Sequence, residues 1–394
     1  MLDFEFSLPT KVIFGRNAQQ QIPGILKKEH VQKVLLHSYD KAQVRKIPVY
    51  EEIKQLLTEN GIAFVEFLGV QPNPTLSFVA EGIQLCRKEG VDFVLAVGGG
   101  SVIDSAKGIA LGVHTSIEDV WSYVEGSREP DSGRTLKTGV VLTAAAAGSE
   151  TSTAAVIMNT ELNVKRGAHH EVNRPFFTVM NPEITFTVPA FQTACGVFDS
   201  IMHVCERYFT YSKDADLTDR MAEAVMKSVI EAGYRVMEEP RDYEARATLM
   251  WGASIAHNNL LGCGRLKGCG LHLIEEEMHS VNARIVHGAG LSVLFPAWAR
   301  VVCKKAPARF AQFAVRVWNI EMDSEHLEET AEKGIALMET FIGELGLPRH
   351  MKEIGVEEAD FDQIVKQCME KGTEVSRMCH LSAEDVKDIL YRAL

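Results

Sequence analysis

The stretch that decides the fold is residues 92–107, Asp-Phe-Val-Leu-Ala-Val-Gly-Gly-Gly-Ser-Val-Ile-Asp-Ser-Ala-Lys. Its apolar start predicts a buried strand, and the residues after the three glycines predict a helix. Glycines allow a tight turn and a close approach of a ligand to the backbone, and the start of a helix attracts phosphate. Ser101 followed by Asp104 resembles a capping box for that helix. We therefore expect a strand–turn–helix unit whose turn binds phosphate. Because the turn is neither GxGxxG nor a P-loop, the alternative is a tight turn without a ligand.

Similar units surround this stretch. Residues 33–37 and 63–68 predict strands, and residues 49–60 and 75–90 predict helices. Strands separated by helices of this length form parallel βαβ units. We expect residues 1–185 to form an α/β domain with an open, mostly parallel, Rossmann-like sheet.

The pattern changes after about residue 185 to long stretches with apolar residues three and four apart. The predicted helices cover residues 191–211, 215–238, 244–261, 268–283 and 291–303 and most of the tail. We expect residues 186–394 to form an all-helical domain. Because no Gly/Ser-rich linker separates the halves, we expect a packed junction, where ligand sites are common.

The composition excludes several classes of function. The 394 residues carry 41 basic and 53 acidic side chains, a net charge of −12, with no dense basic run. Such a chain is poorly suited to nucleic acid or anionic lipid. The apolar runs are too short to span a membrane, and the start lacks the features of a signal peptide. The eight scattered cysteines include no CxxC and do not form a disulfide framework. We expect a soluble, cytoplasmic protein that acts on a small molecule.

A second loop, residues 143–151, follows the apolar run 140–142 and contains four consecutive alanines before Gly-Ser. Small residues would let a planar ring or a phosphate lie against the backbone. A simple packing contact is the alternative.

Candidate metal ligands lie in the second half. Asp199 and His203 are four residues apart in a predicted helix, so their side chains share a face. His272, His279 and His287 follow later in the chain. One carboxylate and two or three imidazoles suit Fe²⁺, Zn²⁺ or Mn²⁺. The alternative is a solvated or capping aspartate beside unrelated histidines.

The order of these motifs resembles the iron-containing (group III) alcohol dehydrogenase family, and within it the butanol dehydrogenase-like branch. The matching segments span most of the chain: Gln71-Pro72-Asn73-Pro74, the glycine turn with Asp104 and Lys107, Gly148-Ser149-Glu150, Asn181-Pro182-Glu183, residues 196–203, Ala256-His257-Asn258, His287-Gly288 and Phe295-Pro296. The resemblance implies the dehydroquinate synthase-like architecture of this family, an α/β domain followed by an all-helical domain that binds metal and substrate.

The resemblance also implies roles for individual residues. The implied metal ligands are Asp199, His203, His272 and His287, and the implied catalytic set is His203, His272 and His287 with Glu276 and His279 as candidates for proton transfer. The implied cofactor contacts are Asp40, Asn73, Gly98, Gly99, Gly100, Ser101, Asp104, Thr143, Ala144 and Ala147. In this arrangement the glycine turn holds the pyrophosphate, and Thr143 and the loop after it line the nicotinamide side.

Residues 38–40 read Ser-Tyr-Asp where relatives that prefer NADPH carry small residues such as glycines. A carboxylate there accepts a hydrogen bond from the ribose 2′-hydroxyl but repels a 2′-phosphate. Asp40 therefore favours NADH over NADPH.

This sequence departs from the family pattern in several places. Glu276 stands where the family has a histidine near the nicotinamide, Ala147 replaces a threonine, and Cys269 replaces a tryptophan. The spacing from His272 to His287 is one residue longer than in relatives. Either a bulge or loop absorbs the extra residue, or His279 replaces one of the ligands.

The function implied is reversible conversion of a small or medium-chain aldehyde into a primary alcohol. We expect Fe²⁺ as the metal, with Zn²⁺ as the alternative. The resemblance also implies a homo-oligomer, which we expect to be a dimer. Two other functions stay open. A sugar-phosphate lyase of the dehydroquinate synthase type would need lysines and arginines for the substrate phosphate and typically a glutamate in place of Asp199. A non-catalytic nucleotide-binding relative would fit the departures at Glu276 and Ala147.

Overall fold

The computed structural model describes residues 1–162, 164–212, 214–370, 376 and 378–394. The chain forms two compact units. One, the α/β unit, comprises Ser7–Val188; the other, the helical unit, comprises Met1–Phe6 together with Pro189–Leu394. The first residues join the helical unit through a hydrogen bond from the backbone N–H of Leu2 to the carbonyl of Gly264. Within the described residues, no helix combines the length and the apolar character needed to cross a bilayer.

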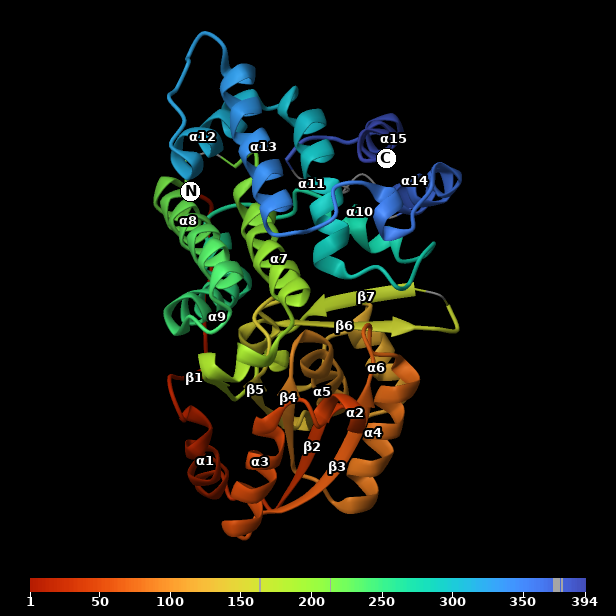
Figure 1. The fold of residues 1–394 in the computed structure, drawn as a ribbon. Helices are drawn as coiled ribbons and strands as arrows, with labels where there is room; N and C mark the ends of the chain where they lie inside the picture. The colour runs from red at the N-terminus through yellow and green to blue at the C-terminus, as the bar shows by residue number, and fades with distance from the viewer. Residues whose placement is uncertain (163, 213, 371–375, 377) are drawn as a thin grey trace. The chain divides into compact units, whose positions relative to one another are not determined.

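The α/β unit contains a six-stranded sheet in the order β1-β8-β5-β4-β2-β3 (Figure 1). Every pairing in it is parallel. The strands are β1 (Lys11–Phe14), β2 (Lys33–Tyr39), β3 (Ala63–Val70), β4 (Phe93–Gly98), β5 (Lys137–Leu142) and β8 (Phe177–Met180). The predicted open parallel sheet is confirmed, and the three strands expected around the glycine stretch are its β2, β3 and β4.

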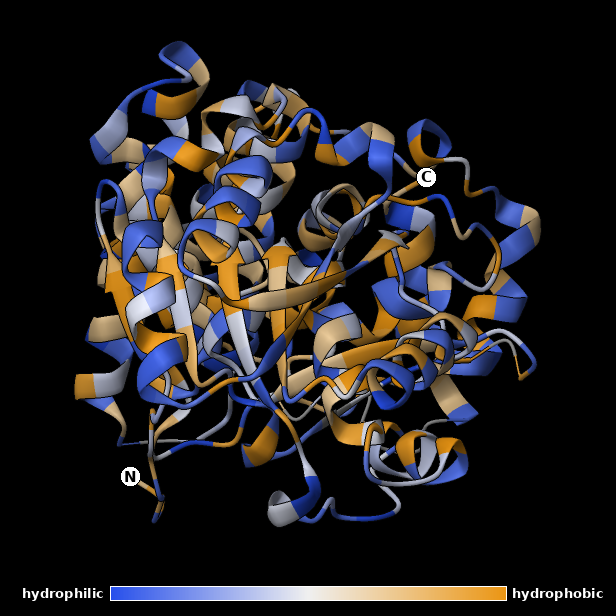
Figure 2. Ribbon diagram, turned by 90° about the horizontal axis from the view of Figure 1, so that it is seen from below, coloured by the Kyte–Doolittle hydropathy of each residue, from blue (hydrophilic) through white to orange (hydrophobic). Residues whose placement is uncertain are grey.

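Helices pack against this sheet because alternate residues of each strand point to opposite faces. They are α1 (Ile22–Lys28), α2 (Lys41–Val44), α3 (Pro48–Glu59), α4 (Leu76–Glu89) and α5 (Gly100–Gly112). The following helix, α6 (Ile117–Val124), contacts α5 and the strand pair described next. Phe93, Leu95 and Val97 of β4 join one buried cluster with apolar residues of α1 and α3. Figure 2 shows the strands mostly in orange, the colour of hydrophobic residues, whereas the helices also carry blue hydrophilic residues.

An antiparallel pair of strands, β6 (Ala154–Asn159) and β7 (Val164–His169), lies outside the sheet. The sequence analysis did not predict it. β7 reads Val-Lys-Arg-Gly-Ala-His, which has one β-branched residue and a glycine and therefore little strand propensity of its own. The pairing with β6 determines its conformation.

The helical unit confirms the predicted all-helical second half. Its helices are α7 (Ala190–Tyr208), α8 (Asp216–Glu238), α9 (Tyr243–His257), α10 (Leu271–Met278), α11 (His287–Cys303), α12 (Pro307–Trp318), α13 (Leu327–Glu344), α14 (Phe361–Glu370) and α15 (Ala383–Arg392). In Figure 1, α7 is the green helix beside α8, α9 and α11, and it is buried along most of its length.

The prediction of one helix over residues 268–283 was wrong in extent. Gly268 and Gly270 have φ angles of +113° and +90°, in the left-handed region that glycine tolerates, so α10 starts only at Leu271. α10 ends at Met278, and residues 279–286 form turns before α11 begins at His287, four residues earlier than expected. This loop provides the room that the long spacing between His272 and His287 requires.

Candidate active site

The predicted helix that carries Asp199 and His203 is α7. The two side chains lie one turn apart on the same face, with 3.3 Å between Asp199 Oδ1 and His203 Nδ1. Both residues are buried, at 4% and 8% exposure. A buried carboxylate is costly unless cations or hydrogen-bond donors surround it.

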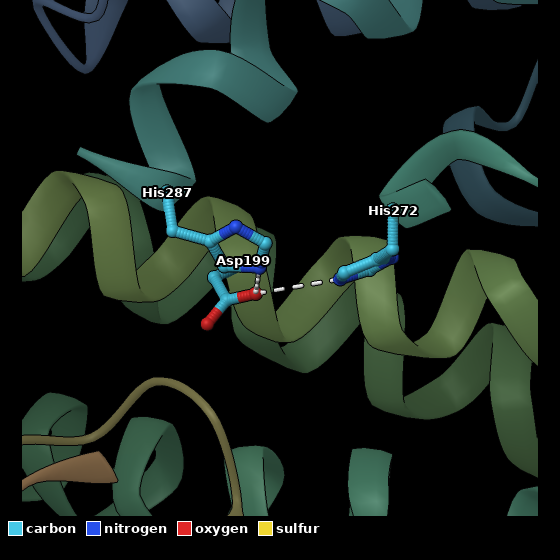
Figure 3. Close-up of side chains that lie close together, drawn as sticks. All are labelled: Asp199, His272 and His287. Atoms are coloured by element: carbon cyan, nitrogen blue, oxygen red, sulfur yellow. Dashed lines mark ion pairs between the residues drawn. The ribbon is translucent and has the colours of Figure 1, made fainter. Parts of the chain in front are cut away.

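Two more histidines reach the same carboxylate oxygen, as Figure 3 shows. His272 of α10 places Nε2 3.7 Å from Asp199 Oδ1, and His287 at the start of α11 places Nε2 at 3.6 Å. α11 comes this close to α7 because Gly288 has no side chain: a Cβ there would lie 2.4 Å from the carbonyl oxygen of Cys195. The structure thus brings together all four residues named as metal ligands.

The donor atoms of this group fit a metal ion. Asp199 Oδ1, His203 Nδ1 and His272 Nε2 are buried, and none of them hydrogen-bonds to a described residue. Leaving several such atoms unsatisfied is expensive in a protein interior. Asp199, His272 and His287 also offer ligand atoms that lie within 4.8 Å of one another. An ion at their centre would satisfy these atoms, and one carboxylate with imidazoles is a donor set for Fe²⁺ or Zn²⁺.

The charges of the group are arranged around Asp199. Burial alone would raise the pKa of the Asp199 carboxyl, but the neighbouring His203, His272 and His287 hold it well below its usual value. Burial lowers the pKa of His203 to about 3. Burial also opposes the charge on His272, but the carboxylates of Asp199 and Glu206 outweigh it and raise the pKa of His272 to about 10. In the metal-free protein at neutral pH, His203 is therefore neutral and His272 is protonated.

The two candidates for proton transfer lie on or next to α10. Glu276 is partly exposed and belongs to neither group of potential ligands in the described residues. His279 directly follows α10, with Nε2 3.7 Å from Glu275 Oε1, and forms a second potential group with Glu275 and His287. Of the two described histidines, His287 reaches Asp199 in the first group, and His279 belongs to the second group.

The glycine turn joins β4 to α5 as expected. β4 ends at Gly98, Gly99 is the N-cap residue, and α5 starts at Gly100. The predicted capping box of Ser101 and Asp104 is wrong, because the N-cap is Gly99, two residues before Ser101, and Ser101 lies within the first turn of the helix. Asp104 instead accepts a hydrogen bond from the Ser149 hydroxyl at 2.6 Å.

The second loop packs against this turn. The backbone N–H of Thr143 donates to the carbonyl of Gly98 at 3.1 Å. A Cβ on Gly99 would lie 3.6 Å from Ala144 Cβ, and one on Gly100 would lie 3.2 Å from Ala147 Cβ. The predicted cofactor residues of both loops are therefore neighbours. Gly98 and Gly99 are buried, and the backbone N–H of Gly99 donates to the Tyr39 hydroxyl at 2.9 Å.

Lys107 of α5 forms hydrogen bonds that hold residues 149–154 against this helix, a role that the sequence analysis missed. Its ammonium donates to the carbonyls of Ser149, Ser152 and Ala154 at 2.7, 3.2 and 2.6 Å, and to the Ser149 hydroxyl at 2.8 Å. The residue is only 1% exposed. A lysine on the apolar face of a predicted helix, three residues after an aspartate, was the available signal, because a buried lysine needs acceptors.

The other two predicted cofactor residues also follow strands of the sheet. Asp40 comes directly after β2 and caps α2, with Oδ1 accepting from the backbone N–H groups of Ala42 and Gln43 at 2.8 and 2.9 Å. Asn73 lies after β3 with a left-handed φ of 56°. The carboxyl ends of adjacent parallel strands meet at one edge of a sheet, where open α/β sheets bind their ligands. Asp40, Asn73 and the glycine turn share that edge.

Comparison with known proteins agrees with this arrangement. The model of the iron-containing alcohol dehydrogenases matches residues 9–182, and the model of the carboxy-terminal part of that family matches residues 193–394. The chain is 36% identical to NADH-dependent butanol dehydrogenase B of Clostridium acetobutylicum and 32% identical to the NADPH-dependent aldehyde reductase YqhD of Escherichia coli, each over the full length of both chains.

The structure agrees as well. It is similar to the crystal structure of NADH-dependent butanol dehydrogenase A from Thermotoga maritima, with a TM-score of 0.93 and 36% sequence identity over 100% of this chain and 99% of that one. Both halves of the chain, its fold and its full-length relatives lead to one assignment. The protein belongs to the iron-containing alcohol dehydrogenase family of oxidoreductases, which interconvert alcohols and aldehydes.

Proposed function

We propose that this protein is a metal-dependent, NADH-linked enzyme that interconverts a small or medium-chain aldehyde of the butanal type and its primary alcohol. The observation that carries the proposal is the group of Asp199, His203, His272 and His287, in which the buried atoms Asp199 Oδ1, His203 Nδ1 and His272 Nε2 hydrogen-bond to none of the described residues. In this proposal residues 1–185 bind the dinucleotide, and residues 186–394 bind the metal and the substrate.

Each residue of the metal group has a distinct task. When bound there, a divalent ion supplies Lewis-acid chemistry at a substrate oxygen. Asp199 provides the negative charge that a cation needs, and its depressed pKa keeps it ionised. His203 is already neutral and offers a lone pair, whereas His272 must lose its proton before it can act as a ligand.

The α/β unit would hold the cofactor, whose nicotinamide supplies or accepts the hydride. The backbone at Gly98, Gly99 and Gly100 and the hydroxyl of Ser101 would hold the pyrophosphate, at the start of the thirteen-residue helix α5. Ala144 and Ala147 leave room for the cofactor beside that turn. Lys107 holds residues 149–154 against α5 before the cofactor binds, so these residues lose less conformational entropy on binding.

The preference for NADH rests on Asp40. One of its oxygens already accepts two backbone N–H groups, so these groups are not available to a 2′-phosphate. The carboxylate charge would also repel that phosphate. The similar butanol dehydrogenases are named as NADH-dependent, whereas the similar reductase of Escherichia coli is named as NADPH-dependent, so the relatives alone do not decide this point.

Several finer assignments also stay predictions. Glu276 and His279 are the candidates for proton transfer, Fe²⁺ is favoured over Zn²⁺, and we expect a homodimer. A cytoplasmic location is supported by the eight cysteines, which all lie in described positions and form no disulfide, because disulfides are rare in that compartment. The match of both halves to alcohol dehydrogenase models favours the oxidoreductase over the sugar-phosphate lyase.

The test combines metal analysis with turnover. Metal-free protein is loaded with Fe²⁺ without oxygen, or with Zn²⁺, and NADH oxidation is followed with butanal. We expect one bound metal per chain and turnover, and we expect His203→Ala to lose both. His326→Ala is the matched control, because His326 is exposed and contacts Asp323 outside the metal group. A wild-type protein that binds NADH and metal but reduces no aldehyde in a panel would be a non-catalytic relative, and the proposal would be wrong.

A further inference from the structure

A buried carboxylate lies behind His272. Glu206 is on α7, three residues after His203, and its side chain is 14% exposed. Oε1 accepts from the ring Nδ1 of His272 at 3.1 Å and from the backbone N–H of His272 at 2.9 Å. Oε2 accepts from the backbone N–H groups of Cys269 and Gly270 at 2.6 and 3.3 Å. Glu206 therefore fixes the first turn of α10 and the ring of His272 to α7 at the same time.

A second carboxylate lies behind His287. Glu275 of α10 is completely buried, and its Oε2 accepts from the ring Nδ1 of His287 at 2.6 Å. α11 carries Gly290 at this point, where a Cβ would lie only 2.6 Å from Glu275 Oε1. The close approach of the two helices leaves room for the carboxylate and for little else.

The two contacts have the same chemical consequence. A neutral imidazole that donates from Nδ1 carries its lone pair on Nε2. In both histidines Nε2 faces Asp199 Oδ1, at 3.7 and 3.6 Å. Once His272 has lost its second proton, the carboxylates select the tautomer and the ring orientation in which both lone pairs point to one place.

We propose that Glu206 and Glu275 are positioning residues, which hold Nε2 of His272 and Nε2 of His287 toward a shared metal ion. This inference rests on the proposed metal site. Carboxylate partners of ligating histidines raise the basicity of the ring and fix its orientation, and removing one typically weakens metal binding by about 10- to 100-fold. Neither glutamate needs to touch the metal or the substrate for this role.

The test uses Co²⁺, whose visible absorption reports the ligand geometry. Glu206→Gln and Glu275→Gln keep the side-chain shape and remove the charge. We expect each variant to bind Co²⁺ about 10- to 100-fold more weakly than the wild type in competition with a chromophoric chelator, and to shift the absorption bands. Glu223→Gln is the matched control, because Glu223 is also buried in the helical unit but accepts from Tyr208 and Gln312. We expect it to leave affinity and spectrum unchanged.

The outcomes separate this inference from the proposed function. Wild-type protein that binds no Co²⁺ would refute the metal centre itself. Wild-type binding that both glutamine variants reproduce in affinity and spectrum would refute only the positioning role. If a variant fails to fold, a measurement on the wild type decides: nitrogen-15 spectra of the Zn²⁺-loaded protein should show His272 and His287 protonated at Nδ1. A ring bound to zinc through Nδ1 would overturn the inference.

Discussion

Replacing Lys107 by methionine removes the ammonium that holds residues 149–154 against α5, while it keeps a side chain of similar length. The three N–H groups of the ammonium have four acceptors within hydrogen-bond distance, three of them backbone carbonyls, and Lys107 is only 1% exposed. Breaking a buried charged network by removing one member costs about 3–5 kcal/mol, because the partners stay behind without compensation. We expect the α/β unit of Lys107→Met to lose that much stability.

The partner most affected is Asp104. Burial raises the pKa of its carboxyl, and the charge of Lys107 is the main opposing influence. Adding Asp104→Asn to Lys107→Met should therefore cost less than the sum of the two single changes, with a coupling of about 0.5–3 kcal/mol. Lys88→Met, at an exposed position on α4, is the control and should change little.

The loss is measured in two ways. Urea unfolding is followed by peptide-resolved hydrogen exchange, because a chain with two compact units need not unfold in a single step. The peptides over residues 143–154 should exchange faster in the variant, and the KM for NADH should rise about tenfold, the cost of reordering about one residue. A destabilisation below about 1 kcal/mol with unchanged exchange in that loop would refute the role given to Lys107.

Three further predictions address the cofactor, the pH dependence and the metal. Asp40→Ser keeps a cap for α2 but removes the charge, so kcat/KM should shift toward NADPH by about tenfold or more; an unchanged ratio in steady-state assays would contradict it. Burial lowers the pKa of His37 to about 4. Between pH 6.5 and pH 4 the folded state therefore binds fewer protons than the unfolded state. The contribution of His37 to the free energy of unfolding is fully present above pH 6.5, and it falls toward pH 4 by up to about 3 kcal/mol. Urea unfolding at pH 7 and 5 should show this loss in the wild type and less of it in His37→Gln. Zn²⁺ binding at pH 7 should release about one proton, from His272, in calorimetry with buffers of different ionisation enthalpy, and no release would contradict the raised pKa.

The sheet could be predicted because its central strands carry their signal locally. Residues 93–97 are apolar and are followed by three glycines, and the structure has the strand β4 at Phe93–Gly98. β7 was missed because its sequence has little strand propensity and forms through its partner. The capping box failed for a similar reason: where α5 starts depends on the path of the glycines, which the spacing of Ser101 and Asp104 does not report.

In the candidate site, too, features with a local sequence signal could be predicted, and features that depend on a distant partner could not. The spacing of Asp199 and His203 was enough to place them on one face of a helix, and the structure has them there. That His272 and His287 meet the same carboxylate was expected only from the family resemblance, because a contact between separate helices leaves no periodic trace in the sequence. Glu206 and Glu275 were missed since each looks like an ordinary helical glutamate until its partner is known.

The hydrogen bond between Leu2 and Gly264 has a consequence for biosynthesis. The chain contributes its first six residues to the helical unit, makes the whole α/β unit, and only then returns to the helical unit at Pro189. At about 5–20 residues per second, a ribosome reaches Gly264 roughly 13–52 s after Leu2. Residues 1–6 are therefore made well before their partner, and the α/β unit has time to fold before the helical unit is complete.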